Sequence, residues 1–79
     1  MKNGNVEKLR GPFRQMVEKW SSSVVARQKV EDFSGGMKKG KSVANADSQG
    51  IGPKEKIMIG RKVGYTAVSL AAWLQSQAK

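Results

Sequence analysis

Two glycine-bearing breaks divide the middle of this 79-residue chain and leave room only for short elements around them. The first break is Ser34-Gly35-Gly36 and the second is Gly50-Ile51-Gly52-Pro53. Because glycine tolerates left-handed backbone and proline cannot continue a helix, we expect the chain to turn at both places. A chain of this length is near the lower limit at which one hydrophobic core suffices. We therefore expect residues 1–79 to form a single domain around one core.

The chain contains no cysteine and no histidine. This composition excludes disulfides, zinc sites built from Cys and His, and nucleophile systems that depend on a histidine base. The six carboxylates are scattered, and no two have the spacing of a metal or acid–base pair. We therefore expect a protein that is not an enzyme and that has no cofactor, metal or catalytic residue.

A formal net charge of +9 arises from 15 Lys and Arg against 6 Asp and Glu. Such a surplus favours polyanionic partners, namely duplex DNA, RNA or an anionic membrane surface, and does not choose among them. The first residues lack the apolar core of a signal peptide, and no apolar run approaches the ~20 residues that span a bilayer. We expect a soluble, cytoplasmic protein.

Apolar residues near the start of the chain recur with helical spacing, at Val6, Leu9, Phe13, Met16, Val17 and Trp20. Gly11-Pro12 interrupts this pattern. Because proline suits the first helical position, the sequence predicts a helix from Pro12 to about Trp20 that packs on the domain. A membrane-surface helix is the minor alternative, because the polar face carries charges of both signs.

The segments on either side of the first break predict short elements. Val24-Val25 predicts one short strand that needs a partner elsewhere, and residues 27–33 predict a helix with Val30 and Phe33 on its apolar face. Residues 38–48 predict a second helix, with Met37 at its entrance and Val43 and Ala46 facing inward. Gly40 would cost about 1 kcal/mol inside a helix, so we expect this helix to start at Lys41 or Ser42.

The last third of the chain predicts a hairpin and a helix. Residues 56–65 form two short strands about Gly60, and with Val24-Val25 they make a minimal three-stranded sheet. Thr66 is the expected N-cap of a helix whose apolar stripe is Ala67, Leu70, Ala71, Leu74 and Ala78. We expect Trp73 at the edge of this stripe to belong to the core. The core should combine Leu70, Leu74 and Val30 with Ile57 or Ile59.

Basic and polar side chains collect on the helix after the first break and on the hairpin. Lys41, Ser42 and Asn45, with Gln49, form a face that can donate to phosphates or read base edges, or that is simply solvated. Four cations within residues 54–62, with one acid among them, favour contact with phosphates. The predicted DNA-binding residues are Lys38, Lys39, Lys41, Ser42, Asn45, Gln49, Lys54, Lys56, Arg61 and Lys62.

The order of these elements resembles the small excisionase-type winged-helix proteins of prophages and integrated elements, which are similar to the AlpA and MerR DNA-binding domains. The likeness covers about Val24 to Gln75. It is carried by short runs in a fixed order: Phe33-Ser34-Gly35-Gly36, Ala44-Asn45, Asp47-Ser48, Gly50, Gly52-Pro53, Ile59-Gly60-Arg61-Lys62-Val63, Tyr65, Ser69-Leu70 and Trp73-Leu74.

The resemblance implies an α+β fold: a winged helix-turn-helix in residues 24–79, with a two- to three-stranded antiparallel sheet as its wing. Residues 1–23 form an additional N-terminal helical extension. The second helix of the motif would enter the major groove, and the hairpin would touch the neighbouring backbone or minor groove. Gly40 and Ala46 depart from the pattern, which implies a short recognition helix that is frayed when free.

The resemblance also implies a function in a mobile element. Such proteins act as excisionases, which bend attachment-site DNA and recruit an integrase, or as transcriptional regulators of the element. The implied partners are double-stranded DNA, an integrase or recombinase, and further copies of the chain on DNA, which would place the protein on the nucleoid.

Two other functions stay open. The apolar face of residues 6–20 could make the chain an adaptor that docks on an integrase or on a second copy, with DNA contact secondary. An RNA-binding domain is less favoured, because the sequence lacks the pair of sheet aromatics that would stack unpaired bases.

Overall fold

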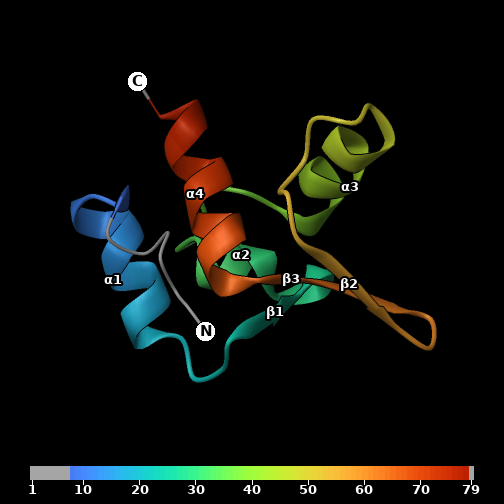
Figure 1. Cartoon of the computed structure of the whole chain (residues 1–79), viewed down its shortest axis with the longest axis horizontal. Coiled ribbons are helices and arrows are strands. Elements are labelled where there is room, and N and C mark those ends of the chain that lie inside the picture. Colours follow the sequence, from blue (N-terminus) through green and yellow to red (C-terminus); the bar gives the residue numbers. More distant parts are fainter. Residues whose placement is uncertain (1–7, 79) are drawn as a thin grey trace.

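The computed structural model describes residues 8–78, in which four α-helices, one 3-10 turn and three strands follow one another. Figure 1 shows α3 and α4 above a small sheet, α1 to its left, and a hairpin that reaches out from the body of the molecule. The elements are α1 (Gly11–Lys19), β1 (Val24–Ala26), η2 (Arg27–Lys29), α2 (Val30–Phe33), α3 (Gly40–Ser48), β2 (Lys56–Ile59), β3 (Lys62–Thr66) and α4 (Ala67–Gln77). The predicted order of elements and the α+β class are confirmed. Val6, which the sequence placed on the first helical face, lies outside the described residues.

The three strands form one antiparallel sheet with the order β1-β3-β2. Val25 lies opposite Tyr65 on the central strand, and Ile57 lies opposite Gly64. The short strand at Val24-Val25 therefore finds its predicted partner in the hairpin. Gly64 packs tightly against β1, because a Cβ at this position would lie 3.0 Å from the carbonyl oxygen of Val25.

One core combines Leu9 with residues of β1, α2, α3, β3 and α4. Its buried apolar residues are Leu9, Val25, Val30, Phe33, Val43, Ala46, Tyr65, Ala67, Leu70, Ala71, Trp73 and Leu74. Trp73 is 9% exposed and donates from Nε1 to the carbonyl of Ile51 at 2.7 Å, which confirms its place in the core. Thr66 is the N-cap of α4 as predicted, since its Oγ1 accepts from the amide of Ser69 at 3.2 Å.

The expectation that Ile57 or Ile59 joins this core is wrong. Cross-strand partners share a face of an antiparallel sheet, and successive residues alternate between faces. Tyr65, Val25 and the helices occupy one face, so Ile57 and Ile59 project from the other. Ile57 is half-buried and Ile59 is 75% exposed. The expectation that Ala78 belongs to the apolar stripe of the last helix is also wrong, because α4 ends at Gln77 and Ala78 is exposed.

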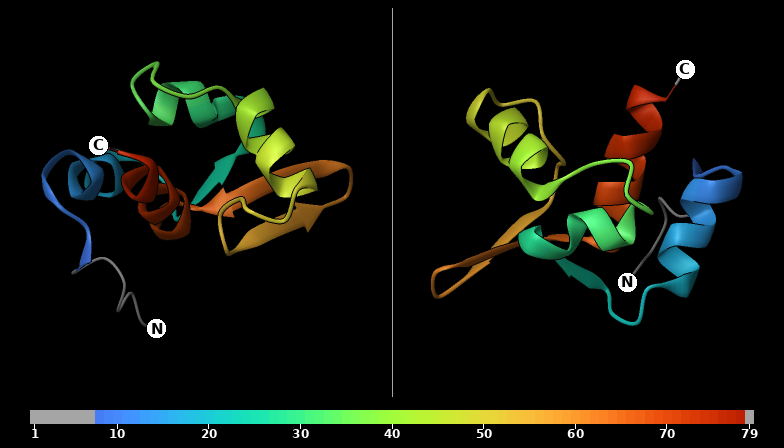
Figure 2. Two further views of the ribbon diagram at one scale, coloured as in Figure 1. Left: turned by 90° about the horizontal axis from the view of Figure 1, so that it is seen from above. Right: turned by 180° about the vertical axis from the view of Figure 1, so that it is seen from behind.

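The helix α1 packs within the chain through its apolar face. Phe13, Met16, Val17 and Trp20 lie against the core. The side chain of Gln75 on α4 fixes the entrance of α1, because its Oε1 accepts from the amide of Arg10 at 2.7 Å. Figure 2 shows α1 beside α4. The predicted packing of this amphipathic helix on the domain is confirmed.

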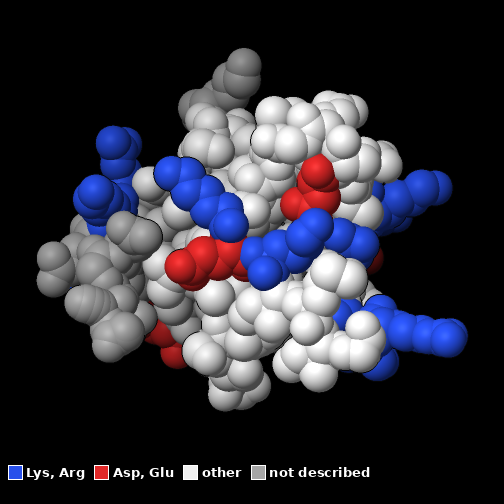
Figure 3. Space-filling model, turned by 45° about the vertical axis from the view of Figure 1, so that its right-hand side comes forward, with Lys and Arg blue, Asp and Glu red and all other residues white. Residues whose placement is uncertain are grey.

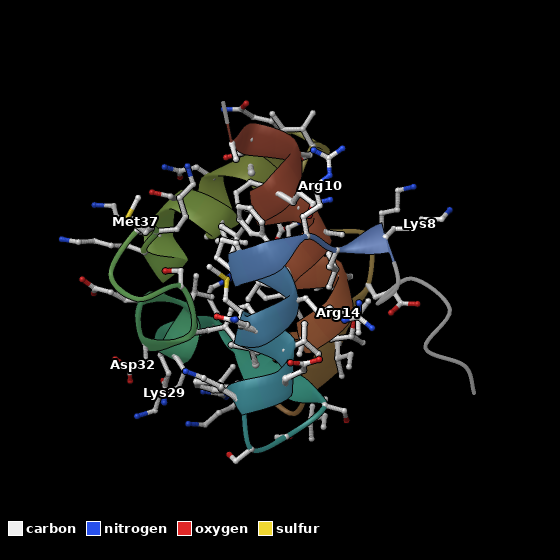
Figure 4. The ribbon with its side chains drawn as sticks, turned by 90° about the vertical axis from the view of Figure 1, so that its left-hand side faces the viewer. Lys8, Arg10, Arg14, Lys29, Asp32 and Met37 are labelled. Atoms are coloured by element: carbon white, nitrogen blue, oxygen red, sulfur yellow. The ribbon has the colours of Figure 1, made fainter. Side chains whose placement is uncertain are left out.

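The first break ends a helical segment that is less regular than predicted. Residues 27–33 form the 3-10 turn η2 followed by the single turn α2. Gly35 and Gly36 adopt φ values of 66° and 87°, which favour glycine. Ser34 is buried, and its Oγ accepts from the amide of Lys38 at 3.0 Å. Met37 in this turn is 80% exposed and projects from the molecule in Figure 4.

The helix α3 begins at Gly40 and not at Lys41 or Ser42 as expected. The helix comes so close to η2 that a Cβ at position 40 would overlap with the carbonyl oxygen of Arg27. Glycine is therefore required at this crossing despite its low helix propensity. Val43 and Ala46 face inward as predicted. No helix within residues 8–78 is long and apolar enough to cross a membrane.

Candidate nucleic-acid interface

A groove of about 510 Å³ lies between η2, the start of α3 and the turn of the hairpin. Its lining residues are Ala26, Arg27, Gln28, Gly40, Lys41, Arg61, Lys62 and Val63. Four of these eight residues are Arg or Lys and none is acidic, so the groove presents positive charge to an incoming anion. Figure 3 shows Lys and Arg side chains spread over the side of the molecule that carries α3 and the hairpin.

Local backbone geometry brings these cations together. Gly60 has a φ of 62° and closes the hairpin between β2 and β3, which leaves Arg61 and Lys62 exposed at its end. The close crossing at Gly40 brings the first turn of α3, and with it Lys41, next to η2. Three segments that are distant in sequence therefore contribute cations to one groove.

Arg27, which lines the groove, forms a closed hydrogen-bonded triangle with two side chains behind the groove. Arg27 donates from Nη2 to Asp47 Oδ2 at 2.8 Å and from Nε to the hydroxyl of Tyr65 at 2.9 Å. The hydroxyl of Tyr65 in turn donates to Asp47 Oδ2 at 2.6 Å. This triangle connects η2, α3 and β3, so it fixes the position of α3 relative to the sheet.

The triangle shifts the pKa values of two of its members. Burial raises the pKa of Tyr65 above its ordinary value of 10.0, and the hydrogen bond to Asp47 raises it further. Burial by itself lowers the pKa of the Arg27 guanidinium, but the hydrogen bonds to Tyr65 and Asp47 outweigh this effect and raise the pKa overall. Tyr65 is therefore neutral and Arg27 charged throughout the physiological pH range.

The structure brings together part of the predicted set of site residues. Lys41, Arg61 and Lys62 line the groove. Ser42, Asn45 and Gln49 are exposed along α3 and at its C-cap, and Lys39 is exposed at its N-cap. Lys56 is exposed on β2.

Two predicted residues lie elsewhere. The ammonium group of Lys38 is 5.6 Å from the centroid of the Trp73 ring, and Lys38 lines a different groove together with Met37 and Leu74. Lys54 lines a groove beside α4 with Glu55 and Trp73. Neither residue lines the groove between α3 and the hairpin.

Sequence reasoning missed Arg27, Asp47 and Tyr65 as a unit. One signal was present, because Asp47 is one of only two acids among seven cations between Lys38 and Lys62. An acid in such a segment is a candidate partner for an arginine that must be held in place.

No protein-family model, curated protein or solved structure matches this chain.

Proposed function

We propose that this chain is a winged helix-turn-helix protein that binds double-stranded DNA. In this proposal α2 and α3 form the helix-turn-helix, α3 is the recognition helix and the β2–β3 hairpin is the wing. The observation that carries the proposal is the convergence of cations from η2, α3 and the hairpin on one groove that has no acidic lining residue.

The exposed face of α3 suits a major groove. An α-helix fits the major groove, where its side chains can reach base edges. Lys41 and Asn45 lie four residues apart and therefore on the same side of α3. Asn45 can pair bidentately with adenine, whereas Lys41 can bind a phosphate of any sequence.

The hairpin suits the neighbouring sugar–phosphate backbone. Arg61 and Lys62 are exposed at its end, and basic side chains in such a position fix the register of a protein on the duplex. Together with Lys41 they would neutralise phosphates on both sides of the groove that α3 enters. The binding would then depend strongly on salt concentration.

Other partners receive less support from the described residues. Stacking of unpaired RNA bases needs exposed aromatic rings, but Phe33, Tyr65 and Trp73 are buried and Phe13 and Trp20 pack against the core. The adaptor hypothesis needs the apolar face of α1, which already packs within the chain. A DNA-binding module with no catalytic step remains the best account.

The resemblance to excisionase-type proteins suggests the biological setting. In that setting the chain would act on the DNA of a mobile element, either as an excisionase that works with an integrase or recombinase or as a transcriptional regulator. Self-association on neighbouring sites and a place on the nucleoid belong to the same proposal.

A salt-series titration on random duplex DNA tests the proposal. Arg61→Ala/Lys62→Ala should weaken binding and reduce the slope of log K against log salt by about 1 for each lost phosphate contact. The matched control is Arg10→Ala/Arg14→Ala, since both double variants lower the formal net charge of +9 by two. Figure 4 shows Arg10 and Arg14 on the side of the molecule that carries α1, and Figure 1 shows the hairpin on the opposite side. Equal slopes for the two double variants would contradict the proposal.

A further inference from the structure

Arg27 has one edge of its guanidinium bound and one edge open. Arginine carries five N–H donors in a planar fork. The Nε and Nη2 groups, which share one edge, bind Tyr65 and Asp47. Among residues 8–78, no hydrogen-bond acceptor lies at Nη1, so the edge formed by Nη1 and the second hydrogen of Nη2 is free. That edge is the one that can bind a phosphate through two parallel hydrogen bonds.

The position of Arg27 places this free edge where a polyanion would pass. Arg27 lines the groove with Lys41, Arg61 and Lys62, and its side chain is 32% exposed. The side chain of Asp47 is only 10% exposed, so its negative charge lies behind Arg27 and is shielded from the groove. Arg27 therefore offers the groove a positive charge, although it belongs to an ion pair.

The partners of Arg27 also reduce the cost of ordering it. A free arginine loses rotational freedom when it binds a ligand. Tyr65 is fully buried and donates to the same oxygen of Asp47 that Arg27 contacts, so the guanidinium is held at two points before any ligand arrives. Within residues 8–78, no hydrogen bond or ion pair holds the side chains of Lys41, Arg61 and Lys62. Arg27 is thus the pre-oriented cation of the groove.

We infer that Arg27 is a further DNA-contacting residue, which binds one backbone phosphate through its Nη1–Nη2 edge while Asp47 and Tyr65 hold the opposite edge. This inference rests on the proposed function. It assigns Asp47 and Tyr65 as positioning residues that touch Arg27 and not the DNA. It also explains why an acid is placed at the end of α3 in an otherwise basic segment.

The test is a salt-series titration on random duplex with Arg27→Gln, Arg27→Lys and Tyr65→Phe, each shown to be folded by circular dichroism at the assay temperature. Arg27→Gln should reduce the salt slope by about 1, because one phosphate contact is lost. Arg27→Lys and Tyr65→Phe should keep the parental slope and weaken binding by roughly tenfold, because the charge stays but its orientation is lost. Arg14→Gln on α1 is the matched control and should change neither quantity.

A purely structural role for Arg27 would give a different pattern. A folded Arg27→Gln variant with the parental slope and affinity would overturn the inference. If Arg27→Gln does not fold, parental affinity in folded Arg27→Lys and Tyr65→Phe would overturn it. In the unchanged protein, NMR should show that added duplex slows rotation of the Arg27 guanidinium and not that of Arg14, and unaltered Arg27 signals would also contradict it.

Failure of this inference can be distinguished from failure of the proposed function. If the parent protein shows no salt-dependent duplex binding, or if Arg61→Ala/Lys62→Ala behaves like Arg10→Ala/Arg14→Ala, the proposed function fails. If the parent protein and the two double variants behave as proposed but the Arg27 variants bind like the parent, only the inference about Arg27 fails and the proposed function stands.

Discussion

The hydroxyl of Tyr65 donates a 2.6 Å hydrogen bond to the carboxylate of Asp47, which lies 18 positions earlier in the chain. Tyr65 is on the central strand and Asp47 is in the last turn of α3, so this bond ties the helix to the sheet. The phenol is fully buried, and its loss would leave Asp47 with one hydrogen-bond donor fewer in a place that water reaches poorly. The orientation of α3 therefore depends on a side chain outside the helix.

Tyr65→Phe should destabilise the protein by about 1–3 kcal/mol, because it removes a buried hydrogen bond to a charged group and leaves the ring packing intact. Urea unfolding followed by circular dichroism measures this change. Asn45→Ala, at an exposed position in the same helix as Asp47, should stay within about 0.5 kcal/mol of the parent. If the two variants have equal stabilities, the hydrogen bond between Tyr65 and Asp47 makes no net contribution to the free energy of unfolding.

Stability should fall in alkaline solution because of Tyr65. The pKa of Tyr65 is raised in the folded protein, so the unfolded chain releases the phenolic proton at a lower pH than the folded one. The stabilisation is complete below the ordinary tyrosine pKa of about 10 and is lost as pH rises through the folded pKa. Unfolding free energies of the parent and of Tyr65→Phe should therefore converge above about pH 10.

The same group can be titrated directly. Tyr65 is the single tyrosine of the chain, so the ultraviolet absorbance of tyrosinate reports its ionisation alone. The native protein should ionise at higher pH than the protein in denaturant. Ionisation at the same pH in both conditions would contradict the burial of the phenol.

Gly40→Ala should destabilise the protein by about 1–3 kcal/mol, although alanine is the better helix former by about 1 kcal/mol. The added Cβ would overlap with the carbonyl oxygen of Arg27 and push α3 away from η2. Ser42→Ala, two positions later and exposed, is the control and should be neutral or slightly stabilising. A stabilised Gly40→Ala variant would mean that α3 does not cross η2 at this distance.

Leu70→Ala and Ile59→Ala test which residues belong to the core and which lie on the exposed face of the sheet. Leu70 is fully buried in α4, and its truncation should cost about 2–5 kcal/mol. Ile59 is 75% exposed, and its truncation should cost less than about 1 kcal/mol. Thermal melts of both variants check this difference, and a large loss for Ile59→Ala would restore Ile59 to the core.

Asn45→Ala and Lys41→Ala should affect DNA binding differently if α3 enters the major groove. After a preferred site is selected from a pool of random duplexes, Asn45→Ala should cost about 1–3 kcal/mol on that site and almost nothing on random duplex. Lys41→Ala should weaken both complexes together. An unchanged ratio of specific to random affinity for Asn45→Ala would remove Asn45 from base recognition.

Periodicity predicted most of the elements and their apolar faces. The spacing of Leu70 and Leu74, and of Val43 and Ala46, places each pair on one side of its helix, and both pairs are buried as predicted. Periodicity could not predict which face of the hairpin packs against the core. Its strands carry apolar residues on both faces, so only the pairing of Tyr65 with Val25 decides that Ile57 and Ile59 turn outward.

The features that were missed depend on distant parts of the chain. Gly40 appears unfavourable within its own helix and is explained by a close contact with Arg27, 13 positions earlier. The triangle of Arg27, Asp47 and Tyr65 joins residues separated by up to 38 positions. Such contacts follow from the packing of elements, which local propensity does not encode.

The exposed apolar residues of β2 have a consequence for the solution behaviour of the protein. β2 is an edge strand, and Met58 and Ile59 on it are largely exposed. A strand of this kind is a template for pairing with another chain, and flanking cations prevent such pairing by mutual repulsion. Cations lie on β2 and at both of its ends, namely Lys54, Lys56, Arg61 and Lys62. Concentrated salt, which under the proposed function would release DNA, also screens this repulsion and favours association between the edge strands of two copies.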